Sequence, residues 1–303
     1  MTITRAHRRF GAFVVVATLL VSVVAFSGRA SAATEYQIGT FNMAGGHDVH
    51  GYVSAGAPDA LVASILERQP AFIALQETCR TWVTRVDQAL PDYAVAFGPV
   101  EVSGGSTAQC KHQSDFGNAI VYRTDFGFDT GPIAHDLQSP AGERREMLCL
   151  AAAARKVVAC STHLTSRGYD SVRIGEAEVA RGILATAYPG FTKFLGGDLN
   201  AVPLSGPTDR FYHSAYGFGA LGEFKEASSP CGNEMTDQTV VVSDTVTCRD
   251  GEFTHDDGAG EEDSPEPRKL DYLFVSPWVD VRSADATSGI HSDHDPLWAS
   301  VAF

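Results

Sequence analysis

Short apolar runs alternate with amphipathic helical patterns along this chain, and that alternation is the feature that most restricts its fold. Residues 37–43 predict a strand, a helix begins at Pro58-Asp59, and residues 71–76 predict a short, continuously apolar strand. Continuously apolar strands separated by helices are typical of parallel or mixed sheets that are buried on both faces. The pattern therefore indicates α/β layers and not an all-β sandwich.

The rest of the chain repeats this pattern. Helices are predicted over residues 80–90 and 170–188, where apolar side chains recur at helical spacing. Two apolar runs, 147–154 and 156–164, lie on either side of the polar Arg155-Lys156 step and predict a hairpin. Further strands are expected at residues 93–97, 118–122, 191–195, 269–275, 281–286 and 297–303.

The first 33 residues have the pattern of a secretory signal peptide. Three arginines precede an apolar run from Phe10 to Phe26, and Ala30-Ser31-Ala32-Ala33 supplies small residues for cleavage. The run is short for a membrane span and contains Gly, Thr and Ser, so an anchor is disfavoured. Residues 34–303 contain no linker and no repeat, and they are expected to form one secreted domain.

Charge limits what this domain can bind. The signal segment carries four of the 23 Lys and Arg residues and none of the 37 Asp and Glu residues, which leaves 19 bases against 37 acids, or −18. Nucleic-acid binding through a broad basic face needs clustered Lys and Arg side chains, so that mode of binding is excluded. A phosphate-ester substrate would require a metal ion to supply positive charge locally.

All six cysteines lie after the signal segment, and an even number in an exported chain predicts three disulfides. The predicted hairpin places Cys149 opposite Cys160, with their backbones about 5.5 Å apart and within disulfide reach. A metal role for the thiols is disfavoured because no Cys-x-x-Cys spacing occurs. The sequence leaves other pairings open. Pairing of the cysteines that are near in sequence adds Cys79–Cys110 and Cys231–Cys248.

Polar side chains gather where the predicted strands end. Taken singly, each of these residues has an ordinary structural explanation, as a surface acid, a core histidine or a turn residue. If the strand ends meet at one edge of the sheets, the oxygen and nitrogen donors form a ligand set for a hard divalent cation such as Mg²⁺. The same set offers a base for water and donors for phosphate oxygens, as metal-assisted phosphoester hydrolysis requires. Its members are Asn42, Glu77, His163, Asp198, Asn200, Asp271, Asp293 and His294.

This ordered set resembles the endonuclease/exonuclease/phosphatase superfamily, to which deoxyribonuclease I-like enzymes belong. The matching segments follow the family's order and extend over nearly the whole chain after the signal segment. The resemblance implies a secreted bacterial member with a four-layer α/β sandwich, in which two mixed β-sheets pack face to face with helices outside. The segments are Thr40-Phe41-Asn42, Leu75-Gln76-Glu77, Ser161-Thr162-His163-Leu164, Gly196-Gly197-Asp198-Leu199-Asn200, Leu270-Asp271-Tyr272 and Ser292-Asp293-His294.

The resemblance implies a set of binding residues. Glu77 is the expected principal metal ligand, with Asn42 and Asp293 as direct or water-mediated ligands of Mg²⁺, or of Mn²⁺ or Ca²⁺. Arg145 precedes a strand, as a phosphate-contacting arginine does in deoxyribonuclease-like members, although arginines at a strand entrance are otherwise usually solvated. Asn118 is the second candidate for phosphate binding, with a purely structural place in the sheet as its alternative.

The resemblance also implies catalytic roles. Asp198 would orient and deprotonate the attacking water, and Asn200 would hold the phosphate or that water. His294, paired with Asp271, would donate to the phosphoryl oxygens. His163 would supply a second imidazole on the other side of the scissile phosphate.

The expected function is that of a secreted, metal-dependent phosphodiesterase, foremost a nuclease acting on DNA or RNA. A lipid phosphodiesterase of the phospholipase C or sphingomyelinase type is the alternative, since exposed aromatics engage lipid surfaces in such relatives, although an aromatic cluster is more often core. A phosphomonoesterase is a third reading, and a binding protein with a decayed site is disfavoured. A monomer without a stable protein partner is expected, and endo- versus exonucleolytic cleavage stays open. The aromatic cluster in question comprises Phe211, Tyr212, Tyr216, Phe218 and Phe224.

Overall fold

The computed structural model describes residues 33–52, 56–140, 142–166, 170–233, 248–256, 267–289 and 291–303. The predicted signal peptide lies outside these ranges except for its last residue. Among the described helices, none combines the length and apolar character that a membrane-spanning segment needs.

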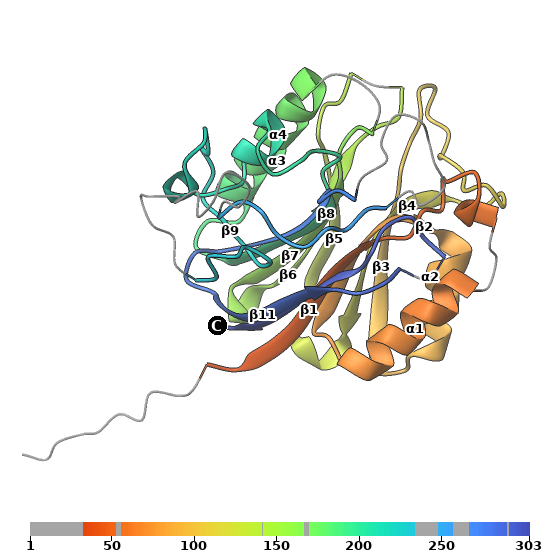
Figure 1. Ribbon diagram of the computed structural model, residues 1–303. Helices are drawn as coiled ribbons and strands as arrows, with labels where there is room; N and C mark the ends of the chain where they lie inside the picture. The colour runs from red at the N-terminus through yellow and green to blue at the C-terminus, as the bar shows by residue number, and fades with distance from the viewer. Residues whose placement is uncertain are drawn as a thin grey trace, which may run out of the picture. The chain divides into compact units, whose positions relative to one another are not determined.

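Two mixed, six-stranded β-sheets form the centre of the fold (Figure 1). Sheet I contains, in spatial order, β11 (Asp280–Ala286), β12 (Leu297–Ala302), β1 (Glu35–Asn42), β2 (Phe72–Cys79), β4 (Phe116–Arg123) and β3 (Tyr93–Pro99). Sheet II contains, in spatial order, β5 (Thr130–Asp136), β6 (Glu146–Ala152), β7 (Val157–His163), β8 (Thr192–Asp198), β10 (Asp271–Val275) and β9 (Lys225–Glu226).

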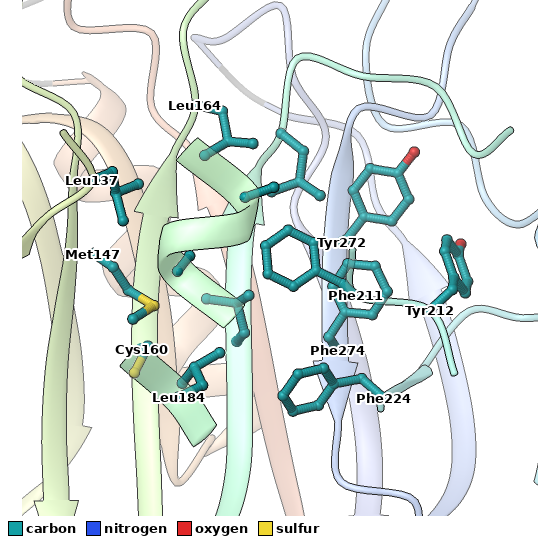
Figure 2. Close-up of a cluster of buried hydrophobic side chains, with 14 of the residues drawn as sticks. Leu137, Met147, Cys160, Leu164, Leu184, Phe211, Tyr212, Phe224, Tyr272 and Phe274 are labelled. Atoms are coloured by element: carbon teal, nitrogen blue, oxygen red, sulfur yellow. The ribbon is translucent and has the colours of Figure 1, made fainter. Parts of the chain in front are cut away.

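Helices cover the outer face of each sheet. On sheet I, α1 (Gly56–Arg68) and α2 (Arg80–Ala89) bury Leu61, Ile65 and Trp82 in one apolar cluster with Leu75 and Val121. On sheet II, α3 (Asp170–Ala187) buries Ala177, Ala180 and Leu184 in a second cluster, and the short α4 (Gly206–Asp209) lies beside α3. Figure 2 shows this second cluster, in which Leu184 and the aromatic rings of Phe211, Tyr212, Tyr272 and Phe274 are gathered. The four-layer sandwich is confirmed.

The inner faces of the two sheets share a third apolar cluster, which includes Ile38, Phe72, Leu148 and Phe194. At one point the sheets approach so closely that only glycine fits. A Cβ on Gly196 would lie 2.7 Å from Ala74 Cβ and 3.0 Å from Thr40 Cβ. The interior of the sandwich is therefore closely packed just before the end of β8.

The topology brings particular strand ends to the same edge. β1 and β2 are parallel neighbours connected through α1, and β7 and β8 are parallel neighbours connected through α3. β10 runs antiparallel to β8 and begins where β8 ends. In the same way, β12 runs antiparallel to β1 and begins where β1 ends. The carboxyl ends of four strands and the amino ends of two therefore lie at one edge of the two sheets.

The six cysteines form the three predicted disulfides, Cys79–Cys110, Cys149–Cys160 and Cys231–Cys248. Cys149 and Cys160 face each other on β6 and β7, as the hairpin predicted. Their Cα atoms are 4.1 Å apart, and not about 5.5 Å, because they approach as a non-hydrogen-bonded pair, in which opposite residues lie closer. Disulfides of this number are typical of proteins outside the reducing cytoplasm.

The aromatic cluster considered for lipid contact is largely core. Phe211, Tyr212, Tyr216 and Phe224 are buried, and only Phe218 is substantially exposed, at 48%. Four of the five rings are therefore unavailable to a membrane surface.

Candidate active site

Alternation along the strands directs four of the predicted site residues into the space between the sheets. Asn42 shares the inner face of β1 with Ile38, since side chains two and four positions apart lie on one face of a strand. His163 and Asp198 end β7 and β8 on the inner face, and Asp271 begins β10 directly opposite Asp198. All four are buried.

Glu77 reaches the same place through a β-bulge. The pairing of β2 with β4 shifts between Leu75 and Thr78, so that Gln76 and Glu77 together face Asn118 alone. Glu77 also has a positive φ of 47°. Regular alternation would turn its side chain toward the helices, and a bulge re-aims a side chain in this way. Glu77 Oε2 then accepts a hydrogen bond from the Gly46 backbone N–H at 3.1 Å.

The Asp198 carboxylate is the centre of the site. Its Oδ2 accepts a 2.9 Å hydrogen bond from the Asn42 amide and lies 3.5 Å from His163 Nε2 and 3.7 Å from His294 Nε2. Its Oδ1 accepts the backbone N–H of Asn200 at 2.8 Å. Burial raises the pKa of Asp198 to about 6, and the charge of His294 opposes that rise. Asp198 is consequently a base that is ionised at neutral pH and is positioned from several sides.

His294 and Asp271 form a hydrogen-bonded pair. His294 Nδ1 lies 2.7 Å from Asp271 Oδ2, and both side chains are buried. Burial alone would lower the pKa of His294, but the carboxylates of Asp271 and Asp198 raise it to about 10. The ring is therefore an imidazolium at neutral pH, with Nε2 directed toward Asp198.

His163 has the opposite character. Burial and the neighbouring Arg145 hold its pKa well below the ordinary value for histidine. Arg145 Nη1 lies 3.1 Å from His163 Nδ1, and the Asn200 amide nitrogen lies 3.0 Å from His163 Nε2, so each ring nitrogen faces a donor. His163 Nε2 also faces the carboxylates of Asp198 at 3.5 Å and Glu77 at 3.8 Å. Arg145 therefore contacts the site through His163, and its Nη1 also contacts Glu143 at 2.9 Å.

The two predicted amide residues differ in position. The Asn200 amide nitrogen donates to the Leu164 carbonyl at 3.1 Å and lies 3.0 Å from His163 Nε2, inside the cluster. Asn118 is buried opposite the bulge, and its amide donates to the Glu146 carbonyl at 3.4 Å. Asn118 therefore lies on β4 directly opposite the bulge that carries Glu77.

Asp293 lies at the rim, between two histidines that sequence reasoning did not select. His47 Nε2 is 3.9 Å and His255 Nε2 is 3.6 Å from Asp293 Oδ2. Burial alone would raise the pKa of Asp293, but the hydrogen bond from His255 and the nearby charge of His294 lower it below the usual range for aspartate. His47 follows the glycines after β1, and His255 lies in an acidic segment with no periodic pattern, so local sequence gave no signal for either.

The donor set suits a hard divalent cation. Burial raises the pKa of Glu77 to about 7, and the nearby Asp198 and Asp293 carboxylates add to the rise, while His294 opposes it. A bound cation relieves such a concentration of carboxylates, and Mg²⁺ prefers oxygen ligands of this kind. Among the described residues, two groups bring ligand atoms within 4.8 Å of one another: His255, Asp293 and His294, and Asp198, Asp271 and His294.

A polar network ties the two sheets together beside the site. Gln76 Nε2 donates to Ser161 Oγ at 2.9 Å, and Ser161 Oγ donates to the Leu75 carbonyl at 2.8 Å. Thr40 Oγ1 donates to Gln76 Oε1 at 3.3 Å. Because these groups are buried and paired across the sheets, they fix the distance between the strand ends that carry the site.

Residues 39–294 match the Endonuclease/Exonuclease/phosphatase family. No curated protein sequence is similar enough to this chain to serve as a relative.

Among solved structures, an endonuclease/exonuclease/phosphatase of Bacteroides vulgatus has 18% identity and a TM-score of 0.60, covering 89% of this chain and 99% of its own. TDP2 of D. rerio in complex with a single-stranded DNA product has 14% identity and a TM-score of 0.62, covering 89% and 100%. A mannosyl-6-phosphatase of Bacteroides thetaiotaomicron has 16% identity and a TM-score of 0.59, covering 88% and 100%.

Proposed function

Because the chain belongs to the endonuclease/exonuclease/phosphatase family, we propose that it is a secreted, divalent-metal-dependent phosphodiesterase whose substrate is DNA or RNA. The observation that carries the proposal is the geometry around the Asp198 carboxylate, which lies 3.7 Å from His294 Nε2, while His294 Nδ1 lies 2.7 Å from Asp271. Asp198 is ionised at neutral pH while His294, 3.7 Å away, is charged. A base and a fixed cation side by side suit hydrolysis of an anionic ester.

Glu77 would hold the metal, with Asn42 and Asp293 as neighbouring direct or water-mediated ligands. The bound ion would neutralise charge on the phosphoryl group and polarise its oxygen, and Mg²⁺ is the expected ion, with Mn²⁺ or Ca²⁺ as alternatives. The glycine backbone that donates to Glu77 Oε2 leaves the other carboxylate oxygen to face the site.

The protein groups divide the remaining work. Asp198 orients the attacking water and takes its proton, and the Asn42 amide and Asn200 N–H hold that carboxylate in place. His294, charged and braced by Asp271, donates to the phosphoryl oxygens as negative charge grows there. His163 contributes a neutral imidazole on the other side of Asp198.

Secretion follows from the N-terminal sequence pattern and agrees with the three disulfides. Residues 34–303 would then be the mature catalytic domain, acting as a monomer. Hydrolysis of a lipid headgroup is the weaker alternative, because four of the five aromatics that would serve membrane contact are buried. Phosphomonoester hydrolysis is the other alternative, since one solved neighbour is a mannosyl-6-phosphatase.

One substrate panel tests the proposal. The mature protein is incubated with plasmid DNA, RNA, sphingomyelin, phosphatidylinositol and a generic phosphomonoester, each with Mg²⁺ and with chelator. Cleavage of DNA or RNA that chelator abolishes is expected, and a nick in the plasmid would identify endonucleolytic attack. Turnover confined to lipids or to the monoester would refute the nuclease assignment and select the corresponding alternative.

A further inference from the structure

His47 presents an N–H group whose direction is fixed by its own loop. Its Nδ1 accepts the backbone N–H of Val49 at 3.1 Å and lies 3.4 Å from that of His50. A neutral imidazole that accepts at Nδ1 carries its proton on Nε2. The Nε2 atom is 3.9 Å from Asp293 Oδ2, which is longer than a hydrogen bond, and the side chain is 36% exposed. His47 therefore offers a donor at the rim of the site to a ligand from solution.

The loop that carries His47 is clamped against the expected metal ligand. A Cβ on Gly45 would lie 2.4 Å from the Glu77 carbonyl oxygen and 2.7 Å from Cys79 Sγ, so the loop rests on Glu77 and on the Cys79–Cys110 disulfide. A Cβ on Gly46 would lie 2.9 Å from Glu77 Oε2, to which the Gly46 N–H donates. A donor held on such a loop loses little conformational entropy when it binds a ligand.

Most other donors around the site already have acceptors. The Asn42 amide donates to Asp198, Arg145 contacts His163 and Glu143, and His294 Nδ1 is bonded to Asp271. The nearby base on the same rim, Lys111, forms an ion pair with Asp48 at 2.5 Å. In a chain with a large excess of acids, a donor that lies beside the expected metal ligands, 3.9 Å from the carboxylate it faces, is suited to hold an anionic oxygen.

We propose that His47 is a substrate-binding residue of this site, whose Nε2–H donates to a phosphate oxygen of the bound ester. This inference rests on the proposed phosphodiesterase function. It assigns to the loop after β1 a direct part in phosphate recognition, in addition to its contact with Glu77.

Two substitutions separate this role from a structural one. His47→Asn keeps a side-chain acceptor near the Nδ1 position, which preserves the turn, but has no donor at the Nε2 position. His47→Gln can place an amide donor near the Nε2 position. His213→Asn is the matched control, because His213 Nδ1 accepts the Ala215 N–H at 3.1 Å in the same local manner, in a turn outside the site.

The measurements are the affinity of the mature protein for inorganic phosphate by calorimetry at saturating Mg²⁺, and hydrolysis of bis-para-nitrophenyl phosphate. For His47→Asn we expect phosphate affinity to fall about tenfold, as the loss of one hydrogen bond to a charged group predicts. KM should rise by a similar factor while kcat changes by less than about twofold, since the contact binds ground state and transition state alike. His47→Gln should recover most of the loss, and His213→Asn should match the wild type.

Unchanged phosphate affinity in His47→Asn would overturn the inference, as would a wild-type protein that binds no phosphate at millimolar concentration. A variant that loses Mg²⁺ affinity but keeps phosphate affinity at saturating Mg²⁺ would instead make His47 a positioning residue for Asp293, and would also overturn it. If the wild type hydrolyses no diester and His47→Asn still weakens phosphate binding, the proposed function is wrong and the assignment of His47 stands.

Discussion

Replacement of Asp271 by Asn tests whether a buried carboxylate keeps His294 charged. Asp271 Oδ2 lies 2.7 Å from His294 Nδ1, and it is the strongest of the groups that raise the pKa of that ring to about 10. The amide has nearly the same shape but no charge, whereas the burial that lowers the pKa remains. The substitution should therefore change the protonation of His294 without creating a cavity.

The magnitude follows from that pKa. An opposite charge at this distance shifts a pKa by about 1 to 3 units, so the pKa falls from about 10 by up to about 3 units, which is up to about 4 kcal/mol at about 1.4 kcal/mol per unit. At pH 8 the ring would change from almost fully charged to mostly neutral. We expect the rate of diester cleavage at pH 8 to fall by a factor of about 10² to 10⁴, the range typical of a lost acid or base group.

The assay is a pH–rate profile from pH 5 to 10 at saturating Mg²⁺, combined with NMR titration of the imidazole nitrogens. In the wild type, activity should rise as Asp198 ionises near its pKa of about 6 and should persist until His294 deprotonates near pH 10. In Asp271→Asn the alkaline fall should move to near neutrality. An exposed aspartate on α2 gives the control, Asp87→Asn, which should leave the profile unchanged. An alkaline limb in Asp271→Asn that coincides with the wild type would refute the reasoning.

Three further predictions follow from the same geometry. Asp198→Ala and His294→Ala should each lower turnover by about 10² to 10⁴ while the circular dichroism spectrum is retained, and near-wild-type turnover in either would contradict its assigned role. Burial raises the pKa of Glu146 to about 7, so its ionised form is disfavoured in the folded state and the wild type loses stability as pH rises from about 4.5 to 7. Glu146→Gln should lack that loss. Between pH 4.5 and 7 its free energy of unfolding, measured by urea titration, should rise relative to that of the wild type by up to about 3 kcal/mol. A difference between the two proteins that does not change with pH would exclude burial of the Glu146 carboxylate as the cause. Gly196→Ala should destabilise the protein by about 1 to 3 kcal/mol, because its Cβ would collide with Ala74 and Thr40. Gly182 on α3 has open space around it, so Gly182→Ala should stabilise the protein by up to about 1 kcal/mol. Thermal unfolding that ranks the two variants in the other order would contradict the packing argument.

Sequence pattern was sufficient for the layers of the fold because apolar periodicity reflects burial directly. The helix at 80–90 and the strands that carry Asn42, His163 and Asp198 were predicted within a few residues. β5 was missed, because Thr130–Asp136 is an edge strand with mostly exposed side chains and a Gly131-Pro132 step, and it exists through its pairing with β6. Edge strands of this kind have little pattern of their own.

The buried face of α3 was also predicted imperfectly. Val172 and Ile174 belong to the apolar pattern of the helix predicted over residues 170–188, but they are only half-buried, and the buried face centres on Ala177, Ala180 and Leu184. Small side chains allow the helix to lie close to sheet II, and hydrophobicity alone does not reveal that preference.

Those residues of the candidate site that lie at strand ends could be predicted from the sequence. The structure brings Asn42, Glu77, Asp198, Asp271 and His294 together at one edge, as the ordered motifs indicated. The positions of His47 and His255 beside Asp293 could not be predicted from the sequence, because both residues lie in loops that only the tertiary fold brings to Asp293. The bulge that turns Glu77 inward was equally hidden, since it arises from pairing with β4 and not from a local signal.

β1 and β12 are hydrogen-bonded neighbours, and next to them Ser292 Oγ donates to the Asn42 carbonyl at 2.8 Å, across 250 positions of sequence. β1 and β12 must therefore pair before Asp293 and His294 can lie beside Glu77. A chain still being made has Asn42 and Glu77 of this site without His294. The complete set of site residues therefore exists only after the final strand has been released and has folded.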